Sequence, residues 1–123
     1  MIPYGKQDIN QADIDAVLAV LQSDFLTQGP VVPLFEQTVA SYCGTQYAVA
    51  VSSATAALHI ACLALDLSPG DWLWTSPITF VASANCALYC GAQVDFVDID
   101  PRSYNMSVER LTEKLVQAEK DGK

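Results

Sequence analysis

The fold is decided by the stretch Tyr47-Ala48-Val49-Ala50-Val51-Ser52-Ser53-Ala54-Thr55-Ala56. Its first five residues form a short, continuously apolar run, which is typical of a strand buried in a parallel sheet. Small and hydroxyl-bearing residues follow this run. Residues 56–65 are then apolar on nearly every side, which predicts a helix buried on more than one face.

The same order of elements continues on the C-terminal side of this stretch. Three strands and three helices are expected in residues 46–123, and two leading helices in residues 1–45. The strands are 47–51, 72–75 and 94–98, and the helices are 8–23, 33–43, 56–65, 80–89 and 107–120. The succession β-α-β-α-β-α predicts an α/β fold with a mostly parallel sheet flanked by helices. The two leading helices are expected to pack outside the sheet or against a partner.

Composition excludes several classes of function. The chain has 123 residues, of which 51% are apolar, and a net charge of −8 from 14 acidic and 6 basic residues. One domain with a sizeable core is expected, and binding to nucleic acid or to an anionic membrane is not. No apolar run approaches the ~18 residues of a membrane helix, and the N-terminus lacks the pattern of a secretory signal. A cytoplasmic location is therefore expected.

The basic residues are unevenly distributed along the chain. Residues 7–101 contain neither lysine nor arginine. An exposed surface normally carries both signs of charge, so we expect much of this stretch to be covered by itself, by further chain or by a partner subunit. An anion bound there would depend on backbone N–H groups, hydroxyls and helix dipoles.

The first strand-to-helix turn is the strongest candidate site in the sequence. Ligands of open α/β sheets bind at the carboxyl ends of the strands, where helix N-termini point. Ser53 and Thr55 supply hydroxyls, and the small side chain of Ala54 lets an anion approach the backbone. Alternatively, Ser53 is simply the N-cap of the following helix. The turn has no glycine fingerprint, so dinucleotide binding is not supported.

Other candidates have more ordinary alternatives. Phe80 follows the second strand and could stack on a flat cofactor, or it could be a core residue at the start of a helix. Asp95 and Asp98 point to opposite faces of an alternating strand, which disfavours a metal site there. His59 with Cys62 and Cys86 with Cys90 could bind zinc if their helices touched, but buried free cysteines are far more common. No metal site is therefore assigned, and His59 is expected to be a core residue.

Several motifs in a fixed order resemble the DegT/DnrJ/EryC1/StrS sugar aminotransferases, which are pyridoxal-phosphate enzymes of the aspartate-aminotransferase fold. The resemblance covers nearly all of the chain and depends on residues 26–30, 35–36, 48–59, 69–71, 76–85 and 91–100. The opening residues 2–7 and the Ser-Ala-Thr form of the usual Ser-Gly-Thr are most similar to one branch. Members of that branch act in pseudaminic-acid and spore-coat polysaccharide biosynthesis.

The resemblance implies a role for several residues. Ser53, Ala54 and Thr55 match the loop that binds the phosphate of pyridoxal 5′-phosphate, and Phe80 matches the aromatic residue that stacks on its pyridine ring. Thr27 and Gly29 match a loop near the nucleotide-sugar site and the dimer interface. A homodimer is the usual state of the family.

The resemblance also implies that part of the catalytic site lies elsewhere. Family members are considerably longer than this chain, and their Schiff-base lysine lies beyond the region that residues 1–123 match. Lys6, Lys114, Lys120 and Lys123 do not match that lysine, and the last three are expected on a solvent-facing helix or tail. We therefore expect an incomplete N-terminal portion of the major domain, with no catalytic residue of its own and no activity by itself. Gly122, directly after a predicted helix, is also typical of a connection to further chain.

Two functions are consistent with these observations. The first is a fragment of an aminotransferase that aminates carbon 4 of a UDP-linked 4-keto-6-deoxy N-acetylhexosamine, with glutamate as the amino donor. The second is a self-contained flavodoxin-like domain that binds a phosphate or FMN at residues 52–55 without covalent chemistry. Two helices with no charged residue fit the second function poorly, because a free domain would expose one face of each.

Overall fold

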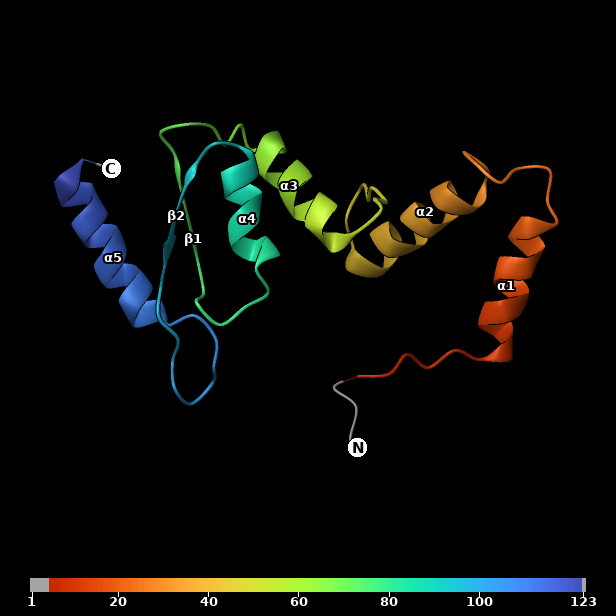
Figure 1. The fold of residues 1–123 in the computed structure, drawn as a ribbon, viewed down its shortest axis with the longest axis horizontal. Coiled ribbons are helices and arrows are strands. Elements are labelled where there is room, and N and C mark those ends of the chain that lie inside the picture. Colours follow the sequence, from red (N-terminus) through yellow and green to blue (C-terminus); the bar gives the residue numbers. More distant parts are fainter. Residues whose placement is uncertain (1–4, 123) are drawn as a thin grey trace. The chain divides into compact units, whose positions relative to one another are not determined.

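A computed structural model describes residues 5–122 of the chain and divides it into two compact units, one ending at Ala50 and the other beginning at Val51. The first unit contains helices α1 (Gln11–Leu21) and α2 (Val31–Cys43) (Figure 1). Helix α1 begins later than the sequence suggests because the Asn10 side chain accepts hydrogen bonds from the Ala12 and Asp13 amides and so caps it. Helix α2 ends where Gly44 adopts a left-handed conformation, as a C-terminal glycine commonly does.

The expected strand at residues 47–51 is not formed among the described residues. This segment has no regular secondary structure and pairs with no strand, and Tyr47 and Val49 are 77% and 78% exposed. A strand requires a neighbour to accept and donate its backbone hydrogen bonds, and the described part of the chain supplies none here. The prediction of a buried strand at residues 47–51 is therefore wrong for this chain.

The second unit contains α3 (Ala54–Ala64), β1 (Trp72–Thr75), α4 (Ala82–Tyr89), β2 (Gln93–Phe96) and α5 (Val108–Asp121). Strands β1 and β2 pair in parallel, with Trp72 opposite Gln93 and Thr75 opposite Phe96. Helix α4 connects the two strands and packs against both of them and against α3 (Figure 1). This is the expected α/β arrangement, with a two-stranded sheet formed by the described residues.

The core of the second unit is built from small side chains where α3, α4 and the sheet meet. Its buried residues are Cys62, Ala82, Cys86, Ala87, Ala92 and Val97. Helix α3 is not covered on more than one side, because Leu58, Ile60 and Leu63 remain exposed. The expected all-round burial is thus wrong for the described chain, which covers only the face of α3 that contacts α4.

Helix α5 is attached to the sheet mainly by one basic side chain. The Lys114 ammonium forms an ion pair with Asp95 of β2 and donates a hydrogen bond to the Phe96 carbonyl at 2.9 Å. It also lies 5.1 Å from the ring centre of Trp74. The side chain of Lys114 is only 24% exposed, so its expected solvent-facing position is wrong. Lys120 does face solvent, and Lys123 lies outside the described residues.

Candidate active site

The turn between Val51 and helix α3 presents open backbone donors. Ser53 is the N-cap of α3, and its Oγ accepts a hydrogen bond from the Ala56 amide at 3.2 Å. Ala54 and Thr55 are the two residues between Ser53 and Ala56, and their amides have no acceptor among the described residues. They are donors of the kind that helix N-termini offer to anions. Capping by Ser53 and anion binding are therefore compatible. The Ser53 side chain accepts only from the Ala56 amide, so the amides of Ala54 and Thr55 remain available to a ligand.

Phe80 lies in the connection between β1 and α4. Its side chain is 74% exposed, so the alternative of a core residue is wrong. The backbone there is held by a hydrogen bond from the Ser83 amide to the Phe80 carbonyl at 3.0 Å, and the hydroxyls of Thr79 and Ser83 lie 3.1 Å apart. An aromatic ring on a fixed backbone with an exposed face is what stacking on a planar ligand requires.

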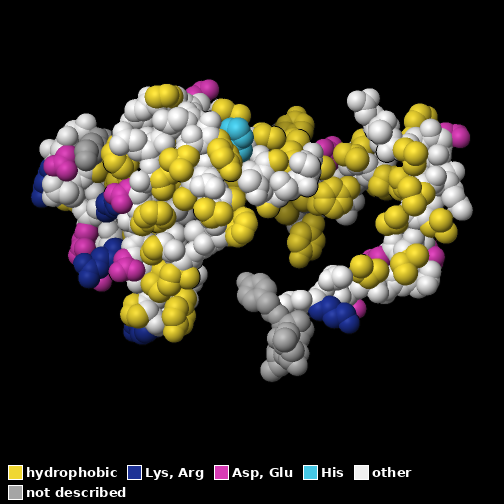
Figure 2. Space-filling model, in the orientation of Figure 1, with side chains coloured by type: hydrophobic (Ala, Val, Ile, Leu, Met, Phe, Trp, Pro, Cys, Tyr) yellow, Lys and Arg dark blue, Asp and Glu magenta, His cyan; other side chains and the backbone are white. Residues whose placement is uncertain are grey.

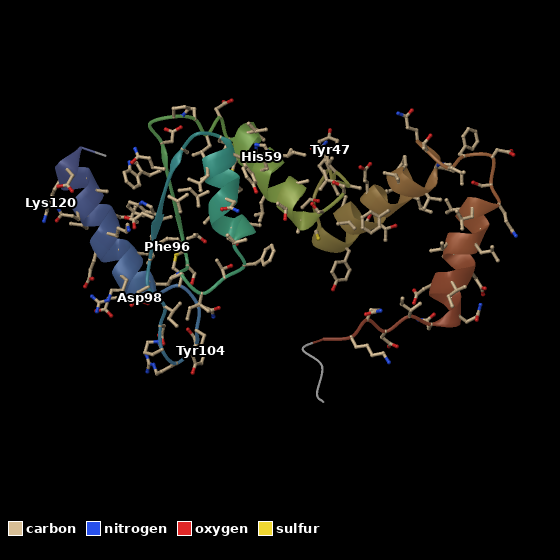
Figure 3. All side chains as sticks on the ribbon, in the orientation of Figure 1. Tyr47, His59, Phe96, Asp98, Tyr104 and Lys120 are labelled. Atoms are coloured by element: carbon tan, nitrogen blue, oxygen red, sulfur yellow. The ribbon has the colours of Figure 1, made fainter. Side chains whose placement is uncertain are left out.

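The turn and Phe80 lie at the same end of the second unit. Helices α3 and α4 both begin at the end where β1 and β2 finish (Figure 1). Asp98 follows β2 toward this end, beyond Phe96 (Figure 3). Its carboxylate accepts a hydrogen bond from the Ile99 amide at 2.8 Å. The Ser53–Thr55 turn thus lies at the start of α3 and Phe80 lies just before α4, and these helix starts are directed toward the end at which the strands finish, where α/β proteins bind ligands (Figure 1).

Thr27 and Gly29 belong to the first unit, in the loop between α1 and α2. A Cβ atom at Gly29 would lie 2.8 Å from the Cβ of Phe25, so only glycine fits there without a shift of the loop. The adjacent Gln28 has a φ of 54°, which is uncommon outside glycine. The loop lines an apolar cavity of about 400 Å³ together with Phe25, Leu26 and residues of both helices.

The thiols and the histidine form no metal site among the described residues. Helices α3 and α4 do touch, but no group of three His, Cys, Asp or Glu side chains could hold an ion in residues 5–122. Burial and a hydrogen bond to Cys86 raise the pKa of Cys62 to about 11. His59, on α3, is half-buried (Figure 3). The centres of the His59 and Tyr89 rings lie 5.2 Å apart in an edge-to-face arrangement.

Two arrangements of polar groups were missed by the sequence analysis. One is the contact of Lys114 with Asp95, 19 positions earlier in the chain, and with Trp74, 40 positions earlier. The other is a hydrogen bond of the Glu36 carboxylate with the Ala50 amide. No local pattern could predict either contact, because both depend on how separate segments pack.

Comparison with known proteins identifies the family of the chain. The model of the DegT/DnrJ/EryC1/StrS aminotransferase family matches residues 7–120. The chain belongs to this family. Its predicted fold, that of the N-terminal part of the family's pyridoxal-phosphate-dependent sugar aminotransferases, is confirmed, and the family's cofactor is pyridoxal phosphate.

Individual relatives cover most of this chain but little of their own length. The chain is 41% identical over 121 residues to a UDP-4-amino-4,6-dideoxy-N-acetyl-β-L-altrosamine transaminase of Campylobacter jejuni, covering 98% of the chain and 32% of the relative. It is 40% identical to the spore coat polysaccharide biosynthesis protein SpsC of Bacillus subtilis, covering 89% and 28%. Among solved structures, the PLP-form of the putative sugar aminotransferase Spr1654 from Streptococcus pneumoniae is similar, with a TM-score of 0.85 and 32% identity. That match covers 91% of this chain and 29% of the other.

The family members matched are therefore about three times as long as this chain. The residues present fit one part of the family's cofactor, since the open amides of Ala54 and Thr55 suit its phosphate and the exposed ring of Phe80 suits its pyridine. The described lysines lie on other elements, with Lys6 before α1 and Lys114 and Lys120 on α5. Of the opening residues that resemble one branch of the family, 2–4 lie outside the described part of the chain.

Proposed function

We propose that this chain contributes the phosphate-binding turn and the ring-stacking aromatic of a pyridoxal-phosphate-dependent nucleotide-sugar aminotransferase. The observation that carries the proposal is the pair of open amides of Ala54 and Thr55. They directly follow the N-cap residue Ser53, in a region without basic side chains. A phosphate bound there would be held by backbone donors and the helix dipole.

Family membership indicates a sugar aminotransferase but does not specify the sugar. We propose that the whole protein aminates carbon 4 of a UDP-linked 4-keto-6-deoxy N-acetylhexosamine in surface-polysaccharide or nonulosonic-acid biosynthesis, with glutamate as the amino donor. The names of the Campylobacter and Bacillus relatives support this choice of substrate and pathway. Thr27 and Gly29 would then lie near the nucleotide sugar, in a homodimer.

The turn and Phe80 would have different tasks toward the cofactor. When bound, pyridoxal phosphate supplies the electron sink for moving an amino group. The Ala54 and Thr55 amides would hold its phosphate, and Phe80 would fix the plane of its ring. Holding the cofactor in one position in this way would orient its reactive atoms for the substrate before any bond changes.

Among residues 5–122, the lysines lie on elements other than the turn and the connection that contains Phe80. Lys114 is already engaged by Asp95 and the Phe96 carbonyl, on the helix that follows β2. An amine that forms a Schiff base must be deprotonated, which an ion pair with a carboxylate opposes. We therefore propose that the Schiff-base lysine belongs to sequence outside these 123 residues and that the chain does not transaminate by itself.

The turn can be tested directly with pyridoxamine 5′-phosphate, which needs no lysine to bind. Ala54 is the first residue of α3, where proline is well tolerated, so Ala54→Pro removes one N–H donor and keeps the helix. We expect calorimetric titration of the 123-residue chain to show about tenfold weaker binding in this variant, since a hydrogen bond to a charged group is lost. Val108→Pro is the matched control, because it makes the same change at the first residue of α5. Equal binding by Ala54→Pro and Val108→Pro would contradict the assignment.

The enzymatic proposal requires the coding DNA beyond codon 123 and its product. We expect an open frame that encodes a lysine flanked by serine, with an acidic residue upstream of it. Its purified product should form 2-oxoglutarate from glutamate with the UDP-linked 4-keto sugar, and much less with the GDP-linked analogue. A stop codon directly after Lys123 would overturn the proposal.

The flavodoxin-like alternative is not favoured. The described residues form a sheet of two strands, and α3 exposes its leucine and isoleucine side chains. A self-contained domain would cover such a helix face.

A further inference from the structure

Phe80 is not held in place by the packing of its own side chain. Its ring is 74% exposed, and the neighbouring Ile78 and Val81 are 64% and 59% exposed. The rotamers open to such a side chain are set by its backbone angles, because few neighbours restrict it. The direction of the ring therefore depends on the hydrogen bonds that fix the connection between β1 and α4 (Figure 1).

Ser83, in the first turn of α4, forms hydrogen bonds to the chain on both sides of the Phe80 ring. Its amide donates to the Phe80 carbonyl at 3.0 Å. Its hydroxyl lies within hydrogen-bond distance of the Thr79 hydroxyl, at 3.1 Å. The bond between these two hydroxyls closes a short loop of chain that contains Phe80. One residue of the helix thus restrains the backbone before and after the aromatic residue.

Ser83 is itself connected to the core of the second unit. Its carbonyl accepts a hydrogen bond from the Cys86 thiol at 3.4 Å. Cys86 and Ala82 are 2% and 4% exposed, on the helix that packs against α3 and both strands. Val81 is the N-cap residue of α4 and makes no side-chain capping bond among the described residues. The hydroxyl pair of Thr79 and Ser83 therefore ties the connection to a helix start that lacks an ordinary cap.

We propose that Ser83 is a positioning residue for Phe80 and acts through its bonds to the Thr79 hydroxyl and the Phe80 carbonyl. This inference rests on the proposed function of Phe80 as the residue that stacks on the pyridine ring. By restricting the backbone on both sides of Phe80, Ser83 limits the rotamers that the ring adopts. The cofactor then meets an aromatic face whose conformational freedom is already reduced, so less entropy is lost on binding.

Nuclear magnetic resonance tests this role without any ligand. Ser83→Ala removes the hydroxyl and Thr79→Val removes its partner, whereas Ser83→Thr keeps a hydroxyl at the same position. We expect either removal to lower the protection of the amide at position 83 against hydrogen exchange about fivefold, because one neutral hydrogen bond is lost. The Phe80 side chain should then spread over more χ1 rotamers, as measured from the couplings of its β hydrogens. Ser83→Thr should retain most of the wild-type behaviour.

Two features of these variants exclude a general loosening of the structure as the cause. Alanine is a better helix former than serine, so Ser83→Ala should not melt α4. The control Thr112→Val removes a hydroxyl that donates to the Val108 carbonyl at 2.8 Å on α5. It should change neither the protection at position 83 nor the rotamers of Phe80.

A double-mutant cycle with Phe80→Leu shows whether Ser83 acts through the ring. We expect Ser83→Ala to weaken the binding of pyridoxamine 5′-phosphate about threefold in a calorimetric titration, the cost of ordering one side chain. In the Phe80→Leu background, the same substitution should cause no further loss. Losses that multiply in the double variant would overturn the positioning role, because Ser83 would then contact the ligand directly or act elsewhere.

The two experiments separate this inference from the proposed function. Absence of binding by the wild-type chain, or equal binding by Phe80→Leu, counts against the proposed function, and the rotamers of Phe80 then decide the role of Ser83. An unchanged rotamer distribution in both Ser83→Ala and Thr79→Val would overturn the positioning role whatever the titration gives.

Discussion

At the scale of single residues, Ser53 determines the start of α3 and the geometry of the candidate site together. Its backbone is extended while the next residue is helical, and its hydroxyl accepts the Ala56 amide. Without this cap, the first turn of α3 would lose one of its few hydrogen-bond partners. The residue thus stabilises the helix whose open end forms the site.

Replacing Ser53 should cost stability in a predictable amount. We expect Ser53→Ala to lower the free energy of unfolding by about 1 kcal/mol, as the loss of an N-cap usually does. Urea unfolding followed by circular dichroism measures the change. Ser53→Asp should retain most of the stability, and Ser52→Ala, at an exposed neighbour, serves as the control. Equal losses in Ser52→Ala and Ser53→Ala would show that the cap is not the cause.

Burial also sets the reactivity of the thiols. Cys43 is exposed, whereas Cys62 is 7% exposed and its pKa is raised to about 11, mainly by burial. We expect a disulfide reagent at pH 8 to modify Cys43 rapidly and Cys62 slowly, with the rate at Cys62 rising as the pH approaches 11. The variant Cys43→Ala should lose the rapid phase, and rapid modification of Cys62 at pH 8 would contradict its burial.

The same shift predicts how stability depends on pH. The folded chain keeps the Cys62 proton in a range where the unfolded chain has already released it, so folding is favoured least at high pH. The free energy of unfolding should therefore fall as the pH rises from 9.0 toward 11. Cys62→Ala should flatten this part of the profile, whereas Cys43→Ala should not.

At the scale of elements, the sheet and α5 are joined through polar contacts more than through apolar packing. Helix α5 has no buried residue, and Leu115 and Val116 remain exposed beside Trp72 and Trp74. Lys114 supplies the ion pair to Asp95, the bond to the Phe96 carbonyl and the contact with the Trp74 ring. One side chain of the helix thus contacts three residues of the sheet, Asp95, Phe96 and Trp74.

Replacing Lys114 should therefore loosen α5. We expect Lys114→Met to shift the tryptophan fluorescence to longer wavelength, because both tryptophans of the chain lie on β1 beside α5. The free energy of unfolding should fall by about 1 kcal/mol, since the pair is only partly screened by solvent. The control Arg110→Met breaks a pair whose side chains are 64% and 58% exposed, and should leave both quantities unchanged. An unshifted spectrum in Lys114→Met would show that other contacts hold the helix.

At the scale of the whole molecule, exposed apolar side chains are widespread, whereas five of the six basic side chains lie in residues 102–123. On the face shown in Figure 2, basic side chains gather over α5 and the loop before it, apart from one near the N-terminal end, and hydrophobic side chains occur over the loop as well as over the other helices. Exposed large apolar residues occur on α1, α2, α3 and α4, among them Leu21, Leu34, Phe35, Leu63 and Leu88. Among residues 5–122, none of the helices has both the length and the apolar character needed to cross a bilayer.

This distribution predicts that the chain associates in solution. Contiguous exposed apolar patches mark interaction surfaces or cause aggregation. We expect light scattering during gel filtration to show a mass that rises with concentration, together with binding of an apolar fluorescent dye. Leu63→Gln should reduce both signals, whereas Lys120→Gln on the polar surface of α5 should not. A monodisperse monomer that binds no dye would contradict this interpretation of the surface.

Local patterns in the sequence were enough to predict most of the helices, strand β1 and a candidate binding turn. Strand β1 matches its predicted residues, and the helices begin and end near residues such as Asn10, Gly44 and Ser53, because capping and turn chemistry act within a few residues. The Ser53–Thr55 turn could be found for the same reason. Only the tertiary structure decided that residues 47–51 remain unpaired, that α3 stays exposed, and that Glu36 and Lys114 anchor distant segments. Strand pairing and side-chain burial depend on neighbours that are remote in the sequence, so no local pattern contains them.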